Sequence, residues 1–388
     1  MKAHSQVMDL FVDLQKEPYD WKKDVIINKP KFLEEIEEAL KIGEIFSLRN
    51  KIYSISSVIN YPRSDKIGLL NIDKNGDTAI LKKGPLLEEL KQILEAHTTE
   101  RAKYYLQRLK KGITEIRTGK INDINLNRWK EYTDVITDSL WILDKRDTSG
   151  AHLGWYWGNF IPQIPHQLMM RYTKRGEWVV DTFVGSGTTL IECKRLGRNG
   201  IGIELNPEVS RKAKELIERE KNIYNVTIEI ITTDSRYVNL REILSIHKIK
   251  KVQLMIMHPP YHNIIRFSKN PNDLSNAKSV EEFIKMFADV VDNTTPYLDK
   301  GRYLGIVIGD KYSGGKWIPL GFYVMNEVLK RNFSLKSIIV KNFEETRGKR
   351  NQKDLWKYRA LVGGFYIFKH EYILLFKKEG EINAINER

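Results

Sequence analysis

The tetrapeptide His258-Pro259-Pro260-Tyr261 combines groups that can hold a flat polar molecule, and it follows directly after the apolar run VQLMIM. A neutral imidazole has one nitrogen that accepts a hydrogen bond. The carbonyl of Pro259 is a second acceptor, which the fixed φ angles of the two prolines hold rigid. The ring of Tyr261 offers a face for stacking. The same residues could instead form a structural turn at the end of a strand.

A glycine-rich turn, DTFVGSGTT at residues 181–189, lies between the apolar run EWVVD and a helical stretch. Glycines there let the backbone approach a ligand closely and permit positive φ, and the start of the next helix offers free N–H groups. In open parallel sheets, ligands bind at the carboxyl ends of such strands. Many nucleotide-binding proteins have a turn of this kind, but it can also be a plain tight turn.

Acidic residues end the apolar runs of this region. Asp181 ends the first, and Glu204 ends the second, at the distance of about 20 residues where an acid holds ribose hydroxyls. Asp234 follows the third, where it could reach an adenine amino group. Each acid alone could be a helix cap or a solvated loop residue. Three acids at consecutive strand ends favour a nucleoside-like ligand.

The second half of the chain alternates strand and helix patterns, which predicts a mostly parallel sheet with helices on both faces. We expect strands at 177–181, 200–204, 226–231, 252–257, 303–309, 335–340 and 371–376. We expect helices at 188–197, 207–223, 280–298 and 320–330.

These motifs resemble those of the DNA amino-methyltransferases, which act on adenine N6 or cytosine N4. The glycine motif of that family reads roughly D-P-F-x-G-S-G-T-T, and Thr182 replaces its proline, a departure at a turn residue. The segment YWGNFIPQIP at 156–165 resembles the family's other cofactor segment, although by itself it could be core packing. WIPL at 317–320 and the closing strand at 369–376 also resemble the family, so the resemblance covers about residues 150–378.

The resemblance implies S-adenosylmethionine as the cofactor and a Rossmann-like α/β sheet, mostly parallel with an antiparallel last strand. The cofactor-binding residues that it implies are Asn159, Phe160, Pro162, Asp181, Phe183, Gly185, Gly187, Thr188, Glu204 and Asp234. Asp181, Phe183, Gly185 and Gly187 would line the methionine end of the pocket, Glu204 would hold the ribose and Asp234 the adenine.

The tetrapeptide would be the catalytic motif, whose usual first residue in the family is Asp, Asn or Ser. An exocyclic amine conjugated to a base ring is a poor nucleophile, and acceptors on its two N–H groups draw the nitrogen toward a tetrahedral geometry. His258 and the Pro259 carbonyl would supply these acceptors, Pro260 the rigidity and Tyr261 the stacking on an extracted base. Alternatively, His258 only shapes the pocket. The histidine also leaves the choice between adenine and cytosine open.

Protonation would remove the acceptor, because imidazolium has no free lone pair. We therefore expect activity to fall as the pH drops through the pKa of His258, near the intrinsic histidine value of about 6.5. We expect no metal, since methyl transfer needs none and the histidines lack ligand spacing.

The formal net charge of +14 favours a polyanionic partner, here double-stranded DNA. Two segments, 101–130 and 341–360, interleave basic residues with aromatic ones, a pattern typical of backbone contact and stacking, although the second could be a solvated hairpin. The predicted DNA-binding residues are Arg108, Lys110, Lys111, Arg266, Lys269, Arg347, Lys349 and Arg350.

We expect two domains, an α+β extension over 1–145 and a catalytic domain over 146–388. In the extension, we expect a helix at 31–41, short strands after it, a helix at 85–96 and a basic helix that could enter a DNA groove. Sequence recognition is assigned to this region, or else to the loop after Tyr261 or to 341–364. The first 145 residues match no family that we can name.

The single cysteine, Cys193, fits a reducing cytoplasm. No apolar run approaches the roughly 20 residues that span a bilayer, so we expect no membrane partner. A monomer or a dimer is expected, and a restriction endonuclease of the same site could accompany the chain. The alternatives are methylation of RNA bases, methylation of protein glutamine, and a catalytically dead DNA-binding or scaffold subunit.

Overall fold

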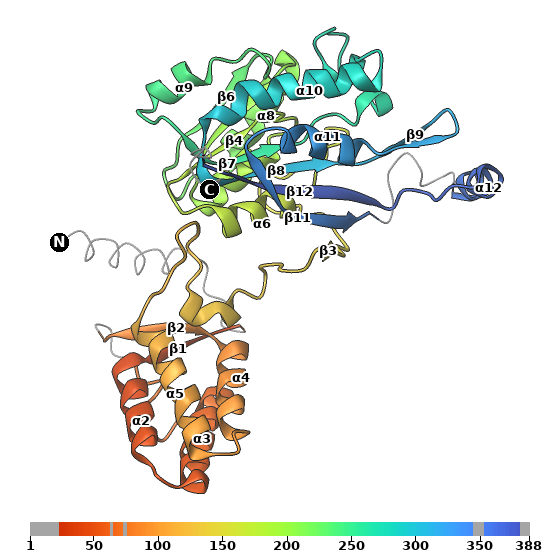
Figure 1. The fold of residues 1–388 in the computed structure, drawn as a ribbon. Coiled ribbons are helices and arrows are strands. Elements are labelled where there is room, and N and C mark those ends of the chain that lie inside the picture. The colour runs from red at the N-terminus through yellow and green to blue at the C-terminus, as the bar shows by residue number, and fades with distance from the viewer. Residues whose placement is uncertain (1–22, 63–64, 73–75, 344–352, 381–388) are drawn as a thin grey trace, which may run out of the picture. The chain divides into compact units, whose positions relative to one another are not determined.

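The computed structural model describes residues 23–62, 65–72, 76–343 and 353–380. The chain divides into two units (Figure 1). Unit 1 comprises Met1–Gly119 and Ile124–Asp134, and unit 2 comprises Lys120–Asp123 and Val135–Arg388. The second unit therefore begins about ten residues before the expected boundary at 145. The reason is strand β3 (Leu140–Trp141), which pairs in parallel with β11 (Phe333–Asn342) of the large sheet.

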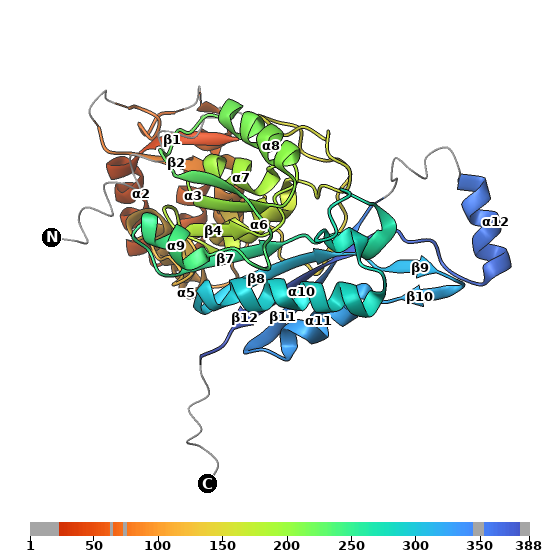
Figure 2. The same ribbon diagram turned by 90° about the horizontal axis from the view of Figure 1, so that it is seen from above.

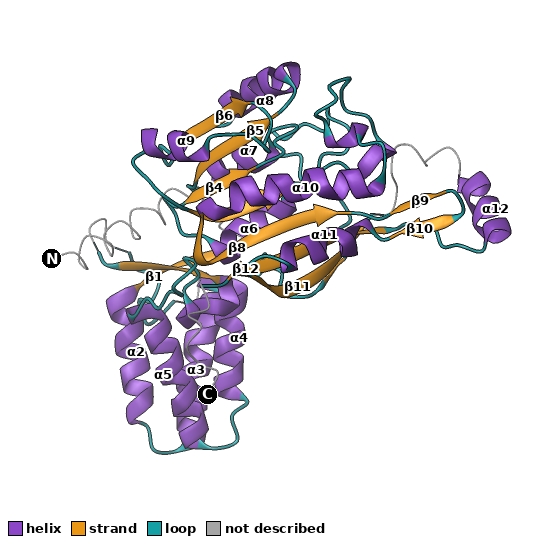
Figure 3. Cartoon of the chain, turned by 45° about the horizontal axis from the view of Figure 1, so that its top comes forward, coloured by secondary structure: helices purple, strands orange, loops and turns teal. Residues whose placement is uncertain are grey.

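The described residues of unit 1 form a two-stranded antiparallel sheet and four main helices, which Figure 3 shows in purple below the orange strands. The strands are β1 (Asp24–Asn28) and β2 (Thr78–Lys82). The helices are α2 (Lys29–Lys41), α3 (Ile45–Asn60), α4 (Lys83–Leu94) and α5 (Thr99–Thr114), and a 3-10 helix, η2, follows at Leu126–Glu131. One hydrophobic core of its own joins all four helices and both strands.

The expectation of short strands after residue 41 is wrong, because the helix α3 forms there. The run IYSISSVI is rich in β-branched residues, which favours a strand. Its buried residues nevertheless include Leu48, Ile52, Ile55 and Ile59, which recur every three to four positions as on one face of a helix. The Glu44 carboxylate caps the helix by accepting hydrogen bonds from the amides of Phe46 and Ser47.

Unit 2 is built on an eight-stranded sheet in the order β3-β11-β12-β8-β7-β4-β5-β6. Its remaining strands are β4 (Trp178–Asp181), β5 (Asn199–Glu204), β6 (Ile228–Thr232), β7 (Val252–Met257), β8 (Leu298–Ile308) and β12 (His370–Lys378). Every neighbouring pair is parallel except those made by β12, which is antiparallel to both β8 and β11. The mostly parallel Rossmann-like sheet with an antiparallel last strand is confirmed.

Helices cover both faces of this sheet (Figures 1 and 2). One layer contains α6 (Gln163–Tyr172), α7 (Thr188–Leu196) and α8 (Pro207–Arg219), and the other contains α9 (Leu240–Ile246), α10 (Val280–Thr294) and α11 (Leu320–Leu329). Successive residues of β4 belong to different cores, Val179 to the first layer and Val180 to the second. This two-sided burial explains why the strands are continuous apolar runs.

A small lobe extends beyond the sheet at the edge where β8 ends (Figure 2). It contains the hairpin β9 (Lys311–Ser313) and β10 (Lys316–Ile318) and the helix α12 (Lys353–Gly363). Two aromatic contacts join the hairpin to the α12 segment, Tyr312 with Phe365 and Trp317 with Phe368, each with ring centroids 4.1 Å apart. Within the described ranges, the helices are all too short or too polar to cross a bilayer.

Candidate active site

One cavity of about 740 Å³ opens at the carboxyl ends of β4, β5 and β7 in unit 2. Parallel pairing places Asp181 of β4 opposite Ile256 of β7, so the glycine turn and the tetrapeptide leave the sheet side by side. Both motifs line this cavity. The sequence-predicted residues on its wall are Asn159, Phe160, Phe183, Gly185, Thr188, Glu204, Asp234, His258, Pro259, Pro260 and Tyr261.

The glycine turn is held open by positive backbone φ angles, +52° at Gly185 and +84° at Gly187. A Cβ added at Gly185 would lie 3.1 Å from the ring of Tyr156, which also lines the cavity. The side-chain amide of Asn159 donates to the hydroxyl of Ser186 at 2.9 Å, which joins the upstream segment to the turn. The turn thus brings backbone to the cavity wall where a larger residue would not fit.

Three of the implied cofactor residues do not line the cavity, and these predictions are corrected. Asp181 is fully buried beneath the turn, where it accepts hydrogen bonds from the amide of Phe183 and the hydroxyl of Thr189. Burial raises its pKa to about 6. Gly187 packs against Ile217 of α8, and Pro162 caps α6. These residues shape the motif from behind the cavity wall.

Glu204 lies at the end of β5 and connects two loops. Its Oε2 accepts a hydrogen bond from the amide of Gly185 and its Oε1 from the amide of Asn206, both at 2.9 Å. Burial outweighs these two bonds and raises the pKa of the carboxyl to about 7. Asp234, on the neighbouring wall, forms an ion pair with Arg236 at 2.7 Å, a partner that the sequence pattern did not predict.

The tetrapeptide continues from β7 along the cavity. The ring of His258 lies 4.9 Å from that of Phe160, and its Nε2 is 3.1 Å from the hydroxyl of Tyr261. Burial lowers the pKa of His258 to about 4, an effect that nearby Glu371 opposes and Lys341 supports. The imidazole is therefore neutral near pH 7. The expectation of a pKa near 6.5 is wrong, because water cannot solvate the imidazolium there.

The matching family model is that of the DNA methylase family for N6 and N4 positions, and it covers residues 31–215. This range begins within unit 1, so the expectation that the first 145 residues match no known family is wrong. The range includes the glycine turn and Glu204 and ends before the tetrapeptide. The Type II methyltransferase M.MjaII of Methanocaldococcus jannaschii is 28% identical over 34% of this chain and 20% of its own length. M2.DpnII of Streptococcus pneumoniae, also a Type II methyltransferase, is 38% identical over 24% of this chain and 34% of its own length.

The chain is similar to the DNA methylase family model over residues 31–215 and to Type II methyltransferases over shorter stretches. It spans only a fifth to a third of the length of these two relatives. Among solved structures, magnesium protoporphyrin IX methyltransferase of Synechocystis PCC 6803 with bound SAM is 14% identical, over 53% of this chain and 71% of that one, with a TM-score of 0.32.

S-adenosylmethionine is the cofactor that the resemblance to this family implies. The residues present fit that molecule. The cavity volume is within the roughly 300–1,000 Å³ of small-molecule sites, and its wall combines aromatic rings with a few polar groups. Glu204 presents a buried carboxylate at the end of the strand next to the glycine turn. A carboxylate there can accept hydrogen bonds from a pair of ribose hydroxyls.

Two further residues of the cavity wall, Lys341 and Glu371, were not predicted as site residues. Lys341 begins a segment interpreted as basic and DNA-facing, yet it is buried and donates to Glu371 at 2.9 Å. The two residues are paired across β11 and β12. Nothing local in the sequence indicates this, because the pairing depends on the register of strands 30 residues apart.

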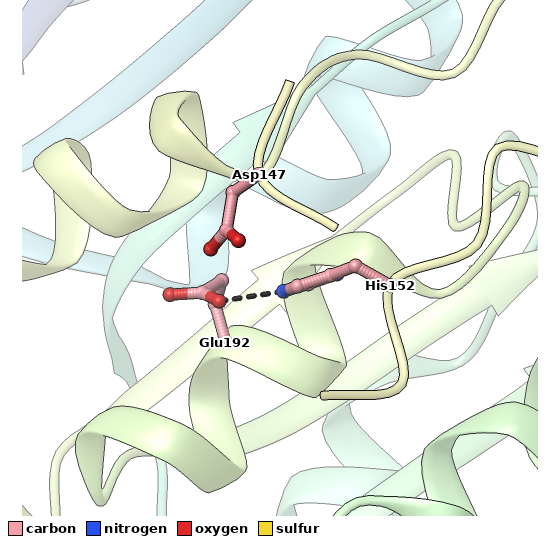
Figure 4. A group of neighbouring side chains, drawn as sticks. All are labelled: Asp147, His152 and Glu192. Carbon is pink, nitrogen blue, oxygen red and sulfur yellow. Dashed lines mark hydrogen bonds and ion pairs between the residues drawn. The ribbon is translucent and has the colours of Figure 1, made fainter. Parts of the chain in front are cut away.

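Behind the glycine motif, a buried cluster of polar side chains connects α7 with the loop that precedes α6 (Figure 4). The Glu192 carboxylate bonds His152 at 2.7 Å and His166 at 2.8 Å. Asp147, His152 and Glu192 offer donor atoms within 4.8 Å of one another, a spacing that a metal ion could use. Arg195, however, lies 3.6 Å from both carboxylates and balances their charge. We therefore interpret the cluster as a structural clamp.

The predicted DNA-binding residues fall into three groups. In unit 1, Arg108 is paired with Glu89 on α4 and Lys110 with Glu37 on α2, so α5 packs within a helix bundle, while Lys111 is exposed. Arg266 and Lys269 are exposed in the loop whose Ile265 and Phe267 line the cavity. Arg347, Lys349 and Arg350 lie outside the described residues.

Proposed function

We propose that the chain methylates the exocyclic amine of a base in DNA, adenine N6 or cytosine N4. The observation that carries the proposal is the shared cavity, whose wall contains both the glycine turn and His258-Pro259-Pro260-Tyr261. The match to the DNA methylase family model and the similarity to Type II methyltransferases support DNA as the substrate. The net charge of +14 supports a polyanionic partner as well.

In this proposal, S-adenosylmethionine supplies the methyl group. Asn159, Phe160, Phe183, Gly185 and Thr188 surround its methionine end, with Asp181, Gly187 and Pro162 supporting them from behind. Glu204 accepts the ribose hydroxyls. Asp234 faces the adenine and keeps lone pairs for its amino group beside the ion pair with Arg236.

The tetrapeptide binds the amine and makes its nitrogen more nucleophilic. The neutral imidazole of His258 accepts one N–H and the carbonyl of Pro259 accepts the other, while Pro260 fixes the backbone. These two acceptors favour a tetrahedral nitrogen with a lone pair available for attack. The ring of Tyr261 stacks on a base extracted from the helix, because the amine is out of reach inside a duplex.

DNA contact is assigned to two surfaces. Arg266 and Lys269 are exposed beside the cavity and fit contact with the phosphates next to the extracted base. Unit 1 is proposed to read sequence, with Lys111 as its exposed basic candidate on α5. Because the curated relatives are Type II methyltransferases, we propose a restriction–modification or host-marking role, with a restriction endonuclease of the same specificity as the partner.

Long-read sequencing of DNA from a host that lacks other methyltransferases tests the proposal. Expression of the full chain should produce N6-methyladenine or N4-methylcytosine within one sequence context, and expression of the His258→Ala variant should not. An unmodified genome, from cells whose purified chain still binds S-adenosylmethionine, would count against DNA methylation. In that case, methylated nucleosides in the RNA of the same cells would favour an RNA base as the substrate.

A further inference from the structure

A chain of polar side chains leads from the tetrapeptide into the sheet. The Nε2 atom of His258 is 3.1 Å from the hydroxyl of Tyr261, and this hydroxyl donates to Oε2 of Glu371 at 2.9 Å. The other oxygen of Glu371 accepts from Nζ of Lys341 at 2.9 Å. Lys341 and Glu371 are direct partners across β11 and β12, with only 6% and 9% of their surfaces exposed.

The direction of each hydrogen bond in this chain is determined by the ion pair. Burial alone would raise the pKa of Glu371, but Lys341 and the other partners outweigh it, and the pKa lies below its usual value. An ionised carboxylate only accepts hydrogen bonds. The single proton of the Tyr261 hydroxyl must therefore point to Glu371. The phenol oxygen can then only accept from His258.

It follows that Nε2 of the neutral imidazole carries the proton and Nδ1 carries the lone pair. No hydrogen bond to Nδ1 of His258 occurs among the residues that the structure describes. A histidine at this position needs such control, whereas the Asp, Asn or Ser usual in the family always presents an acceptor oxygen. An imidazole accepts only through the nitrogen without the proton.

We propose that Glu371, oriented by Lys341, sets the tautomer of His258 through the Tyr261 hydroxyl, so that Nδ1 accepts the N–H of the target amine. Glu371 and Lys341 are positioning residues here, since they act through Tyr261 and His258. The role of Nδ1 rests on the proposed function, but the tautomer itself is a property of the chain alone.

The Glu371→Gln variant should reverse the hydrogen bonds. Lys341 donates to one oxygen of Glu371, so the introduced amide should turn its oxygen to Lys341 and its NH₂ group to Tyr261. The Tyr261 hydroxyl would then accept from the amide and donate to Nε2 of His258. The proton of His258 would move to Nδ1, and the acceptor for the amine would be lost.

Long-range proton–nitrogen NMR of the full chain with ¹⁵N-labelled histidine measures the tautomer without any substrate. The His258→Asn variant identifies the His258 signal. We expect the Nε2–H form in the wild type and the Nδ1–H form in Glu371→Gln, with thermal unfolding checked for both. A wild-type Nδ1–H form, or the same tautomer in the two proteins, would overturn the proposal.

A double-mutant cycle separates positioning from a structural role. In the wild-type background, Glu371→Gln should lower the single-turnover methylation rate on the order of 10²-fold, with little change in cofactor affinity. In the His258→Asn background, the same change should alter the rate less than about twofold, because an amide oxygen accepts in either case. Equal losses in both backgrounds would contradict positioning through His258. If no substrate is methylated but the NMR result holds, the proposed function fails while the tautomer assignment stands.

Discussion

The amide of Gly185 donates to the Glu204 carboxylate at 2.9 Å, which fixes the glycine turn to the end of the neighbouring strand. Burial raises the pKa of this carboxyl to about 7, so the carboxyl titrates near neutral pH in the free protein. An ionised carboxylate accepts two ribose hydroxyls, whereas a protonated one accepts them less well.

Cofactor affinity should therefore rise with pH through about 7. Below that value, we expect the affinity for S-adenosylmethionine to fall by up to about tenfold per pH unit. Isothermal titration calorimetry between pH 6 and 8, in buffers of different ionisation enthalpy, should also show proton release on binding. The Glu204→Gln variant should bind weakly and without this pH dependence. Equal affinity across the range in the wild type would contradict the assignment of Glu204.

The methylation rate should depend on pH through a different residue, His258. Burial lowers its pKa to about 4, so the imidazole remains an acceptor at higher pH. Single-turnover rates at saturating cofactor should be flat between roughly pH 5.5 and 8 and should fall as the pH approaches 4. In His258→Asn, the fall due to imidazole protonation should disappear. A fall centred near 6.5 in the wild type would show that the imidazole is solvated.

Gly185→Ala should reduce cofactor binding more than it reduces stability. The residue has φ of +52°, and its new Cβ would lie 3.1 Å from the Tyr156 ring on the cavity wall. Gly176→Ala is the matched control, since Gly176 has φ of +77° and a Cβ there would meet nothing within 4 Å. Both changes should cost about 1–2 kcal/mol of unfolding free energy. Only Gly185→Ala should weaken calorimetric binding of S-adenosylmethionine, and equal effects would argue against the turn as the cofactor site.

Glu192→Ala should destabilise unit 2 by about 3–5 kcal/mol, because it leaves Arg195 and two histidines around a buried gap. Glu215→Ala, which removes an exposed pair with Arg211, is the control and should cost at most about 1 kcal/mol. Hydrogen bonds from His152 and His166 outweigh burial and lower the pKa of Glu192, so its contribution should be lost as the pH falls below 4.5. Urea unfolding at pH 7 and pH 4 measures both effects. Equal costs for the two variants would rule out the clamp.

Arg266→Gln with Lys269→Gln should weaken DNA binding across all sequences and flatten its salt dependence. Two lost phosphate contacts lower the slope of log K against log salt by about 2. Lys248→Gln with Lys250→Gln removes the same charge before β7, at the end of that strand opposite His258. This control should leave the slope almost unchanged. Similar slopes for the two double variants in fluorescence anisotropy would place the DNA elsewhere.

The sequence predicts the sheet of unit 2 well because its strands are short apolar runs with helices between them. The runs at β4 and β7 are buried on both faces, and their parallel pairing brings residues 182–189 and 258–261 to one edge. Unit 1 was harder to predict. Its α3 contains several β-branched residues, which favour strands, and the packed core of the bundle decides in favour of the helix.

The parts of the site that sequence reasoning missed depend on tertiary contacts. Lys341 and Glu371 meet through the register of β11 and β12, which a bulge between Leu335 and Ser337 shifts. The pKa of His258 depends on burial that the tetrapeptide alone does not reveal. Likewise, the sequence predicts that Arg108 and Lys110 face DNA, but both form ion pairs with acidic residues on neighbouring helices.

Transfer of a labelled methyl group tests the central claim most directly. The purified chain would be incubated with S-adenosylmethionine carrying a CD₃ group and with separate pools of duplex DNA, RNA and protein. Nucleosides and amino acids would then be analysed by mass spectrometry. We predict CD₃ on adenine N6 or cytosine N4 of the DNA pool, and none with His258→Ala. Label in RNA or protein alone, or no label although the cofactor binds, would contradict the proposal that His258 and Pro259 present a DNA amine to the donor at Gly185.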